Sequence, residues 1–393
     1  MRVLHVISTL GPGAAGHQLR LLVRRMPHDS EIVTLDAGGD LTGTPVHRVG
    51  SVRDHDPAAV RRLRRLMRSG RYDLVHTHLY RAGLQGRIAA RLAGIRHMVA
   101  TEHHLDAETI EGRRFTPGVR ALYLAGERLG QVTIAPSPAI AARLRSWGVP
   151  GRRITIIPKA IDAGEFRFDP GVRAAARARL GIQEDRAVIG GVGRLEPDKR
   201  FDLLIRAIAE VPAATLLLVG DGPARAALER LAEIEGVAGR VRFAGPVAHP
   251  RDMLCAMDVF ASPDQSSFGL ATLEAVACGL PAVYGSCVPL EERAAARDPV
   301  SGTFRLSHDR ESLPRALRAE MLCLAERRGG RLPARSAGEP YDADRLADSV
   351  SSLYETIYAR PMKRRVIGPL PGHRGQFGRK NSFPLPGGSV RNA

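Results

Sequence analysis

Long apolar runs are missing from this sequence. No stretch of the 393 residues approaches the roughly 18 consecutive apolar residues that a membrane-spanning helix needs. The apolar run near the N-terminus is short and soon followed by Gly and Pro. We therefore expect a buried first strand there rather than a signal peptide, and a cytoplasmic globular protein.

Cysteine is scarce and lacks the spacing of a metal site. Three of the four cysteines have mostly apolar neighbours, so we expect buried, reduced thiols rather than a disulfide framework. The four are Cys255, Cys278, Cys287 and Cys323. Zinc ligand sets, RNA-binding aromatic motifs and helix-turn-helix signatures are also missing, so the net charge of +17 does not by itself predict a nucleic-acid partner.

Acidic residues are absent from residues 361–393. This segment holds seven Lys or Arg and eleven Gly or Pro, without helical or strand periodicity. We expect a disordered tail. A solvated extension explains its composition better than an arm that binds polyanions.

Short β-rich runs alternate with helix-length runs in both halves of the chain. The expected strands are 3–8, 31–36, 74–77, 97–101, 132–135 and 154–157, then 187–192, 214–219, 241–244, 259–262 and 281–284. This alternation predicts an α/β protein with one parallel sheet in each half and a ligand between the two. We expect domains over 1–165 and 170–340, a last helix over 341–360 that packs back across them, and the tail.

A glycine-rich loop follows the first expected strand. Gly11, Gly13 and Gly16 form a G-x-G-x-x-G pattern before a helix expected from His17, and Asp36 follows about 20 residues later. This is the dinucleotide fingerprint and suggests NAD. Parallel sheets need glycines at many such turns, so an NAD-dependent enzyme is kept as an alternative.

Two pairs of acidic residues are separated by one residue each: Asp54 with Asp56, and Asp342 with Asp344. Such a pair could hold a metal against a diphosphate. Asp56 directly precedes Pro57, however, which is typical of a helix N-cap, so we expect caps and no metal site. The arginines of residues 58–68 are expected to face solvent, with contact to the inner face of an anionic membrane as the alternative.

Histidines lie at the ends of two first-half strands. His76 and His78 end one strand, with Arg81 just beyond, and His103 and His104 follow the next. The carboxyl ends of parallel strands form the ligand edge of a sheet. No carboxylate or cysteine stands at a spacing suited to zinc, so we expect these side chains to hydrogen-bond a polar substrate.

The second half supplies groups suited to an anion. Arg194 and Lys199 follow a glycine turn at a strand end, and they combine a planar fork with a point charge, as a diphosphate leaving group would require. A second glycine turn is formed by residues 220–223. The loop 264–267 leads into a helix that carries Glu274, and a helix N-terminus favours an anion.

These motifs, in this order, resemble the retaining glycosyltransferases of family four. The resemblance covers residues 1 to about 360 and rests on Gly193-Arg194 with Lys199, 219–223, 266–270 with Glu274, and 279–281. It implies the GT-B fold, in which two Rossmann-like domains with parallel sheets face each other across a cleft. It also implies transfer of a sugar from a nucleoside diphosphate sugar, UDP- or GDP-linked, to a saccharide, lipid-linked or small-molecule acceptor. Configuration would be retained, without metal or bound cofactor.

The resemblance also implies a role for each matching residue. Arg194 and Lys199 would bind the diphosphate, and His103 would lie near the donor sugar. The donor would be bound by Gly193, Gly220, Asp221, Gly222, Ser266, Phe268, Gly269, Leu270 and Glu274, the last at the ribose hydroxyls. The phosphate loop and acceptor side would comprise Gly11, Gly13, Gly16, His78 and Arg81.

Three positions depart from the family pattern. Ser266 stands where the family usually has Glu, Lys159 where it has Asn and Ala160 where it has Gly. Serine carries no charge, so we expect an active enzyme with an altered donor preference. The alternatives are a sugar-nucleotide epimerase of the same fold, the NAD-dependent enzyme, and a non-catalytic protein that binds sugar nucleotides.

Overall fold

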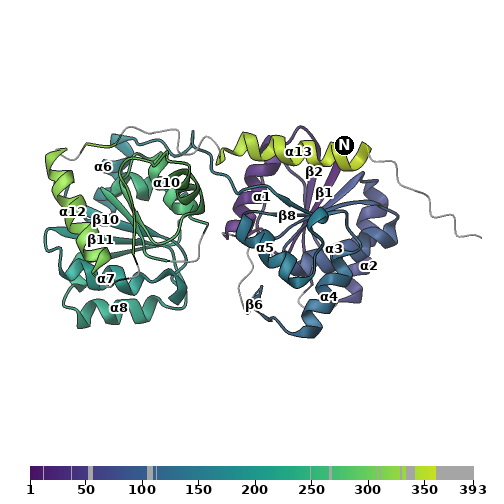
Figure 1. Cartoon of the computed structure of the whole chain (residues 1–393), viewed down its shortest axis with the longest axis horizontal. Coiled ribbons are helices and arrows are strands. Elements are labelled where there is room, and N and C mark those ends of the chain that lie inside the picture. The colour runs from purple at the N-terminus through teal and green to yellow at the C-terminus, as the bar shows by residue number, and fades with distance from the viewer. Residues whose placement is uncertain are drawn as a thin grey trace, which may run out of the picture. The chain divides into compact units, whose positions relative to one another are not determined.

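A computed structural model describes residues 1–359, except 12, 37, 52–55, 104–108, 112, 248, 265–267, 308, 310, 328–329 and 333–340. It contains two parallel sheets, one in each half of the chain, as predicted (Figure 1). Residues 1–358 form one compact unit. The tail that we expect to be disordered lies outside the described residues. Within the described part of the chain, no helix is long and apolar enough to cross a membrane.

The first sheet has seven strands in the order β3-β2-β1-β4-β5-β8-β9. Its strands are β1 (Arg2–Ile7), β2 (Asp29–Thr34), β3 (Val46–Arg48), β4 (Leu74–His78), β5 (His97–Thr101), β8 (Val132–Ala135) and β9 (Ile154–Ile156). Its helices are α1 (Ala14–Arg25), α2 (Pro57–Gly70), α3 (Tyr80–Ala93), α4 (Pro117–Glu127) and α5 (Pro138–Trp147), and β6 (Thr109–Ile110) pairs with β7 (Arg113–Arg114). Central strands such as β1 and β4 are buried on both faces, which explains why they are recognisable in the sequence as apolar runs.

The second sheet has six strands in the order β12-β11-β10-β13-β14-β15. Its strands are β10 (Ala187–Val192), β11 (Ala214–Val219), β12 (Val241–Gly245), β13 (Val259–Ser262), β14 (Ala282–Tyr284) and β15 (Thr303–Arg305). Its helices are α6 (Pro170–Leu180), α7 (Phe201–Ala209), α8 (Arg225–Ile234), α9 (Arg251–Ala256), α10 (Leu270–Ala277), α11 (Val288–Ala295) and α12 (Ser312–Glu326). The core around α9 and α10 includes Cys255, Cys278 and Cys287, so their predicted burial is confirmed, and all four cysteines are free.

The helix caps follow the sequence signals. The Asp56 carboxylate accepts hydrogen bonds from the N–H groups of Ala58 at 2.8 Å and Ala59 at 3.1 Å, which confirms the predicted N-cap. Asp54 lies outside the described residues. Asp342 accepts a 2.8 Å bond from the Asp344 N–H at the start of the last helix. These acids therefore satisfy backbone donors that a helix start leaves unpaired.

The last helix, α13 (Ala343–Ala359), lies against the first sheet (Figure 1). Its buried face shares a core with residues of β1, β4 and β5, namely Ala347, Val350, Tyr354 and Ile357 with Val3, Leu74 and Val99. The chain thus returns from the second half to complete the core of the first. Closure across both domains stays a prediction.

Candidate active site

The turns after β10 and β11 approach each other closely. The Gly193 N–H donates to the Val219 carbonyl at 2.9 Å, and Gly220 has a φ of +131°. A Cβ atom at Gly220 would lie 1.9 Å from the Gly193 carbonyl oxygen, and one at Gly222 would lie 2.5 Å from the Leu195 oxygen. Both positions therefore require glycine, and the exposed Asp221 lies between them.

The two predicted cations lie on the turn that follows β10, but they are held differently. Arg194 has a side chain 66% exposed and pairs with Glu196. Lys199 is 22% exposed, and its Nζ lies 2.7 Å from a carboxylate oxygen of the buried Asp264. Exposed ion pairs are weak, so Arg194 is free to turn toward a ligand, whereas Lys199 is held by a buried partner.

The start of α10 is shaped by another glycine that cannot be replaced. Gly269 has a φ of +87°, and a Cβ there would lie 2.5 Å from Cys287 Sγ. Phe268 is half-buried just before it, and Leu270 begins the helix. Ser266 lies outside the described residues, so its predicted contact with the donor stays a prediction.

Glu274 lies in the second turn of α10 and is almost completely buried. Burial raises the pKa of this carboxyl to about 8, because water no longer stabilises the charged form. At neutral pH the group is therefore mostly protonated and is able both to donate and to accept hydrogen bonds.

The glycine-rich loop of the first half is shorter than predicted. The helix expected from His17 begins at Ala14, so Gly16 lies in its first turn rather than in the loop. A Cβ at Gly16 would lie 2.7 Å from the Gly11 carbonyl oxygen, which explains the need for glycine. Gly13 precedes α1 and offers no side chain to cap it, so the helix start is available to an anion.

Arg81 and Asp36 hold each other in a two-pronged ion pair, with distances of 2.9 and 3.0 Å. Arg81 is largely buried and also donates to the Ser51 carbonyl at 2.6 Å. Both carboxylate oxygens of Asp36, the acidic residue of the dinucleotide fingerprint, thus already accept hydrogen bonds from Arg81. The arrangement counts against the NAD alternative, and it gives Arg81 a structural role beside the predicted one.

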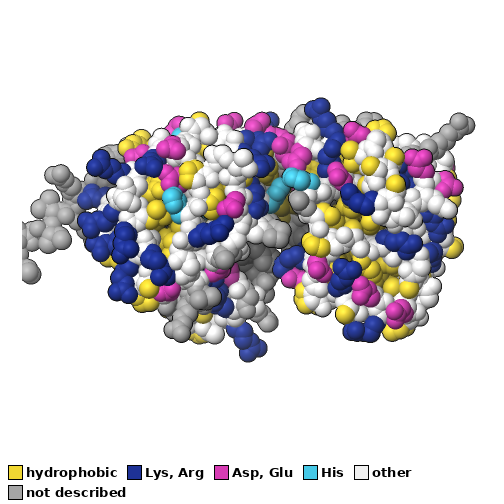
Figure 2. All heavy atoms as spheres, turned by 180° about the vertical axis from the view of Figure 1, so that it is seen from behind, with side chains coloured by type: hydrophobic (Ala, Val, Ile, Leu, Met, Phe, Trp, Pro, Cys, Tyr) yellow, Lys and Arg dark blue, Asp and Glu magenta, His cyan; other side chains and the backbone are white. Residues whose placement is uncertain are grey.

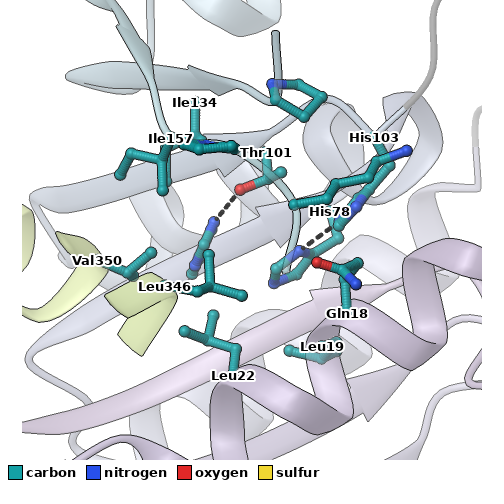
Figure 3. A pocket seen from close by; sticks show the side chains of 14 residues that line it. Gln18, Leu19, Leu22, His78, Thr101, His103, Ile134, Ile157, Leu346 and Val350 are labelled. Carbon is teal, nitrogen blue, oxygen red and sulfur yellow. Dashed lines mark hydrogen bonds between the residues drawn. The ribbon is translucent and has the colours of Figure 1, made fainter. Parts of the chain in front are cut away.

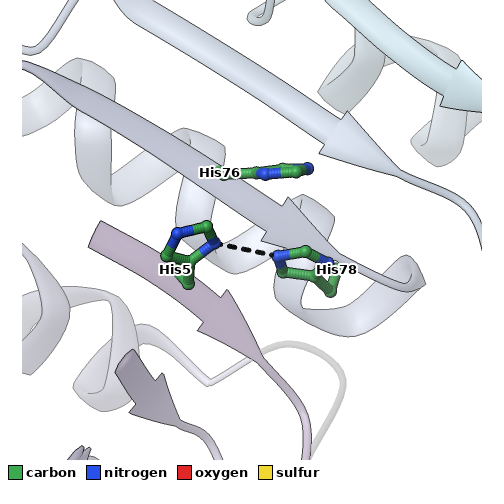
Figure 4. A group of neighbouring side chains, drawn as sticks. All are labelled: His5, His76 and His78. Atoms are coloured by element: carbon green, nitrogen blue, oxygen red, sulfur yellow. Dashed lines mark hydrogen bonds between the residues drawn. The ribbon is translucent and has the colours of Figure 1, made fainter. Parts of the chain in front are cut away.

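Histidines form a connected polar seam on one face of the first sheet. His5 on β1 pairs in register with His76 on β4, and His78 ends β4. His5 Nδ1 lies 3.2 Å from His78 Nε2 (Figure 4), and His78 Nδ1 lies 3.1 Å from His103 Nε2 (Figure 3). The sequence did not predict that His5 would take part, although its place on the central strand beside His76 was a usable signal.

A second branch of the seam runs through His76. Its Nδ1 lies 2.5 Å from the Tyr354 hydroxyl of α13, and its Nε2 lies 2.8 Å from the Thr101 hydroxyl. Burial lowers the pKa of His5 and of His103 to about 3, and the pKa values of His76 and His78 lie well below 6.5 for the same reason. All four imidazoles are therefore neutral at physiological pH.

A small cavity of about 30 Å³ adjoins this seam, with room for about two water molecules (Figure 3). Its polar lining comes from Gln18, His76, His78, Thr101, His103 and Lys159. Gln18 is fixed by two bonds to the backbone of Ala160, at 2.7 and 2.8 Å. Burial lowers the pKa of Lys159 to about 8, so it keeps most of its charge at neutral pH.

The residue between Thr101 and His103 is a buried acid. Glu102 is 2% exposed and accepts a 3.1 Å hydrogen bond from the Tyr123 hydroxyl. Burial raises its pKa to about 7. The predicted first-half residues His78 and His103 both line the small cavity.

The arginines of α2 face solvent. Lys and Arg side chains gather on the surface of the first half, as Figure 2 shows. On α2 the exposed ones are Arg61, Arg62, Arg65 and Arg68. The apolar side of α2 lies inward, with Leu63 and Met67 in the core, so only the charged side is available to an anionic surface.

Two family models match the chain. The model described as Glycosyltransferase Family 4 matches residues 11–165, and the model described as Glycosyl transferases group 1 matches residues 186–325. Together they cover both sheets, apart from β1, which precedes residue 11.

Named relatives agree with these models. The chain is 34% identical over 301 residues to a D-inositol 3-phosphate glycosyltransferase of Rhodococcus jostii (strain RHA1), which covers 71% of this chain and 64% of that protein. It is 29% identical over 343 residues to the D-inositol 3-phosphate glycosyltransferase of Mycobacterium tuberculosis (strain F11), covering 82% and 67%. The chain therefore spans about two thirds of the length of these relatives.

Solved structures share the fold. HepE of Anabaena in complex with UDP and glucose has a TM-score of 0.75 and 21% identity, covering 91% of this chain and 100% of that one. WaaG, a glycosyltransferase involved in lipopolysaccharide biosynthesis, has a TM-score of 0.63 and 20% identity, covering 91% and 98%. The predicted GT-B fold is thereby confirmed.

Proposed function

The chain belongs to glycosyltransferase family 4, and on that premise we propose that it transfers a sugar from a UDP- or GDP-linked donor to an acceptor with retention of configuration. The donor would bind to the second domain, residues 170–340, and the acceptor to the first, residues 1–165. The reaction would take place in the cytoplasm, at or near the inner face of the membrane.

The observation that carries this proposal is the pair of glycine turns after β10 and β11 with cations beside them. Gly220 leaves no room for a side chain, because a Cβ there would lie 1.9 Å from the Gly193 carbonyl oxygen, and neither glycine has a side chain that would keep a ligand from the backbone. Arg194 and Lys199 follow on the same turn. Glycine turns and cations at the carboxyl ends of parallel strands suit a diphosphate.

The proposed reaction balances without a protein base. The bond between the anomeric carbon and the diphosphate oxygen breaks, and the acceptor oxygen bonds to the same face of that carbon. The acceptor hydroxyl proton passes to the departing diphosphate. Charge grows on the diphosphate as the bond breaks, so Arg194 and Lys199 stabilise the transition state more than the ground state.

His103 and Glu274 would position the two ends of the donor. His103 is neutral and lines the small cavity, so it would hydrogen-bond a sugar hydroxyl. Glu274 is protonated at neutral pH and would bind the ribose. Residue 266 would influence donor choice, because serine replaces a charged side chain there.

The acceptor is proposed only by class, as a saccharide, a lipid-linked sugar or a small molecule. The relatives from Rhodococcus jostii and Mycobacterium tuberculosis are named for D-inositol 3-phosphate, so a phosphorylated cyclitol is the first acceptor to test. The exposed arginines of α2 would bring the chain to an anionic membrane if the acceptor is a lipid.

The alternatives make different demands. An NAD-dependent enzyme would have to break the pair between Asp36 and Arg81 to bind a ribose. A sugar-nucleotide epimerase would consume the donor without any acceptor. A non-catalytic protein would bind the donor without turnover.

Thermal shift measurements against UDP, GDP, their sugars, NAD and NADP test the proposal. We expect stabilisation by one nucleoside diphosphate family and its loss in Arg194→Ala. Arg206→Ala is the matched control, because Arg206 is 58% exposed and also pairs with a glutamate. Stabilisation by NAD alone would overturn the proposal. Turnover of every bound donor without acceptor would favour the epimerase.

A further inference from the structure

Three imidazoles form a hydrogen-bonded chain that ends at the candidate active site. His5 comes from the centre of the first sheet, His78 from the end of β4 and His103 from the loop after β5. The two nitrogen-to-nitrogen distances along the chain are 3.2 and 3.1 Å. The exposed fractions of the three side chains fall between 0 and 6%, so bulk water does not interrupt the chain.

A chain of neutral imidazoles allows only two arrangements of its protons. Each ring carries one N–H, and each nitrogen pair needs one donor and one acceptor. Either every ring donates toward His103, or every ring donates toward His5. The proton on His103 is therefore decided by its neighbours and not by His103 alone.

The two ends of the chain are unequal. Among the described residues, neither His5 Nε2 nor His103 Nδ1 has a hydrogen-bond partner. If the rings donate toward His5, a permanent unpaired N–H is left in the core, and buried unpaired donors are rarer than unpaired acceptors. If they donate toward His103, the spare N–H belongs to a residue that lines the cavity, where a ligand oxygen can accept it.

We propose that His5 and His78 are positioning residues that hold His103 as the Nδ1–H tautomer, so that it presents an N–H donor to an oxygen of the donor sugar. The identity of that ligand rests on the proposed function, whereas the tautomer does not. The positive charge of Lys159, which also lines the cavity, favours the opposite tautomer. No hydrogen bond joins Lys159 to His103 among the described residues. The cost of an unpaired N–H on the buried His5 therefore determines the tautomer.

A metal ion is the competing explanation for these histidines. His5, His76 and His78 each offer a nitrogen, and these atoms lie within 4.8 Å of one another (Figure 4). The nitrogens have other partners, however. His76 contacts two hydroxyl groups, and His5 and His78 contact each other. Hydrogen bonding accounts for these contacts without a metal.

Nuclear magnetic resonance of protein with ¹⁵N-labelled histidine tests the tautomer directly. The two-bond couplings between the carbon-bound ring protons and the ring nitrogens distinguish Nδ1–H from Nε2–H. The histidine signal that is lost in His103→Asn is assigned to His103. We expect Nδ1–H for His103 at pH 7 in the wild-type chain. An Nε2–H signal would overturn the proposal, as would one equivalent of transition metal in the purified protein.

Variants of His5 test whether the tautomer is set from a distance. In His5→Leu we expect His103 to become a mixture of both tautomers, and kcat/KM to fall about tenfold, which is the effect of one weakened hydrogen bond. In His5→Asn the amide nitrogen occupies the place of Nδ1 and still donates, so both properties should recover. Tyr354→Phe alters only the His76 branch and should leave the His103 signal unchanged.

The outcomes separate this proposal from the proposed function. A wild-type Nδ1–H signal in a protein that turns over no nucleotide sugar would support the tautomer and reject glycosyl transfer. Unchanged His103 signals in a folded His5→Leu would reject the positioning role even if transfer occurs. If His5→Leu does not fold, the wild-type signal still decides the tautomer.

Discussion

The two sheets share one architecture but end in opposite chemistry. At the ligand edge of the first sheet, neutral histidines are buried and bonded to one another. At the edge of the second, glycine turns are followed by cations that are at least partly exposed. The histidines of the first edge are therefore preorganised and uncharged, although Lys159 beside them keeps its charge, whereas the second edge is charged and its Arg194 is able to adjust.

This difference matches the two parts of a nucleotide sugar. A diphosphate needs charge, and exposed cations supply it at little folding cost because water solvates them until the ligand arrives. A sugar needs hydrogen bonds of fixed direction, which buried neutral groups supply. The contrast also predicts that acid, mutation and alkali affect the two halves differently.

The largest effect should come from acid on the first half. His5, His76, His78 and His103 are neutral when folded, but they take up protons near pH 6.5 when unfolded. The stability that these histidines contribute to the folded state is thus complete above pH 6.5. It is lost as the pH falls below that value, by at most about 1.4 kcal/mol per pH unit for each histidine. The raised pKa of Glu102 offsets one such contribution, so these five groups together contribute at most about 4 kcal/mol per pH unit.

Hydrogen exchange by mass spectrometry between pH 7.5 and 5.5, corrected for intrinsic rates, checks this expectation. Peptides of β1 and β4 should lose protection before those of β10 and β11. Among the described residues, the second half has one histidine, His249, whose side chain is 69% exposed. Equal loss of protection in both halves would contradict the comparison.

A single methyl group at Gly220 should be the next largest disturbance, and it acts on the second half. Gly220→Ala combines a positive φ with a contact of 1.9 Å to backbone, so we expect a loss of at least about 3 kcal/mol or of nucleotide binding. Gly239→Ala is the control, because a Cβ there meets no atom within 4 Å. Denaturant titration compares the two, and similar free energies of unfolding would contradict the assignment of a close approach.

Removal of Arg194 should affect binding and leave stability unchanged. Its side chain is 66% exposed, so Arg194→Ala should unfold at the wild-type temperature. We expect kcat/KM to fall roughly 100-fold, since the cation meets charge that develops in the transition state. Arg206→Ala should keep full activity. A loss of stability in Arg194→Ala would mean that the arginine belongs to the fold.

The smallest effect concerns Glu274 and has the opposite pH sign from the histidines. Its pKa is about 8 when folded and about 4.5 when unfolded, so the folded state holds the extra proton between these values. Stability contributed by this group is lost as the pH rises through that window, by at most about 1.4 kcal/mol per pH unit. Glu274→Gln should flatten the slope between pH 5 and 8, as measured by denaturant titration. An unchanged slope would mean that a group other than Glu274 holds the extra proton of the folded state.

Most central strands were predictable, because strands buried on both faces are apolar throughout. β5, β8, β10, β11 and β13 were predicted to the residue. The edge strands β3 and β15 were not predicted, since three half-exposed residues leave no apolar run. The cap at Asp56 was predictable from one neighbouring proline.

The connections within the site were not predictable. Tyr354 reaches His76 across 278 residues, and this contact depends on how α13 returns to the first sheet. The pairing of Asp36 with Arg81 likewise depends on the spacing of two strand ends. Sequence spacing identified the polar residues at each edge, whereas their partners are set by the packing of distant elements.

One binding comparison tests the central claim that the charged edge holds the diphosphate and the neutral edge holds the sugar. Calorimetry would measure the affinity of the free nucleoside diphosphate and of the matching nucleotide sugar in Arg194→Ala and His103→Ala. We predict that Arg194→Ala weakens the binding of both ligands alike and that His103→Ala weakens only the binding of the nucleotide sugar. Weakening of the free diphosphate by His103→Ala, or no effect of Arg194→Ala on either ligand, would contradict it.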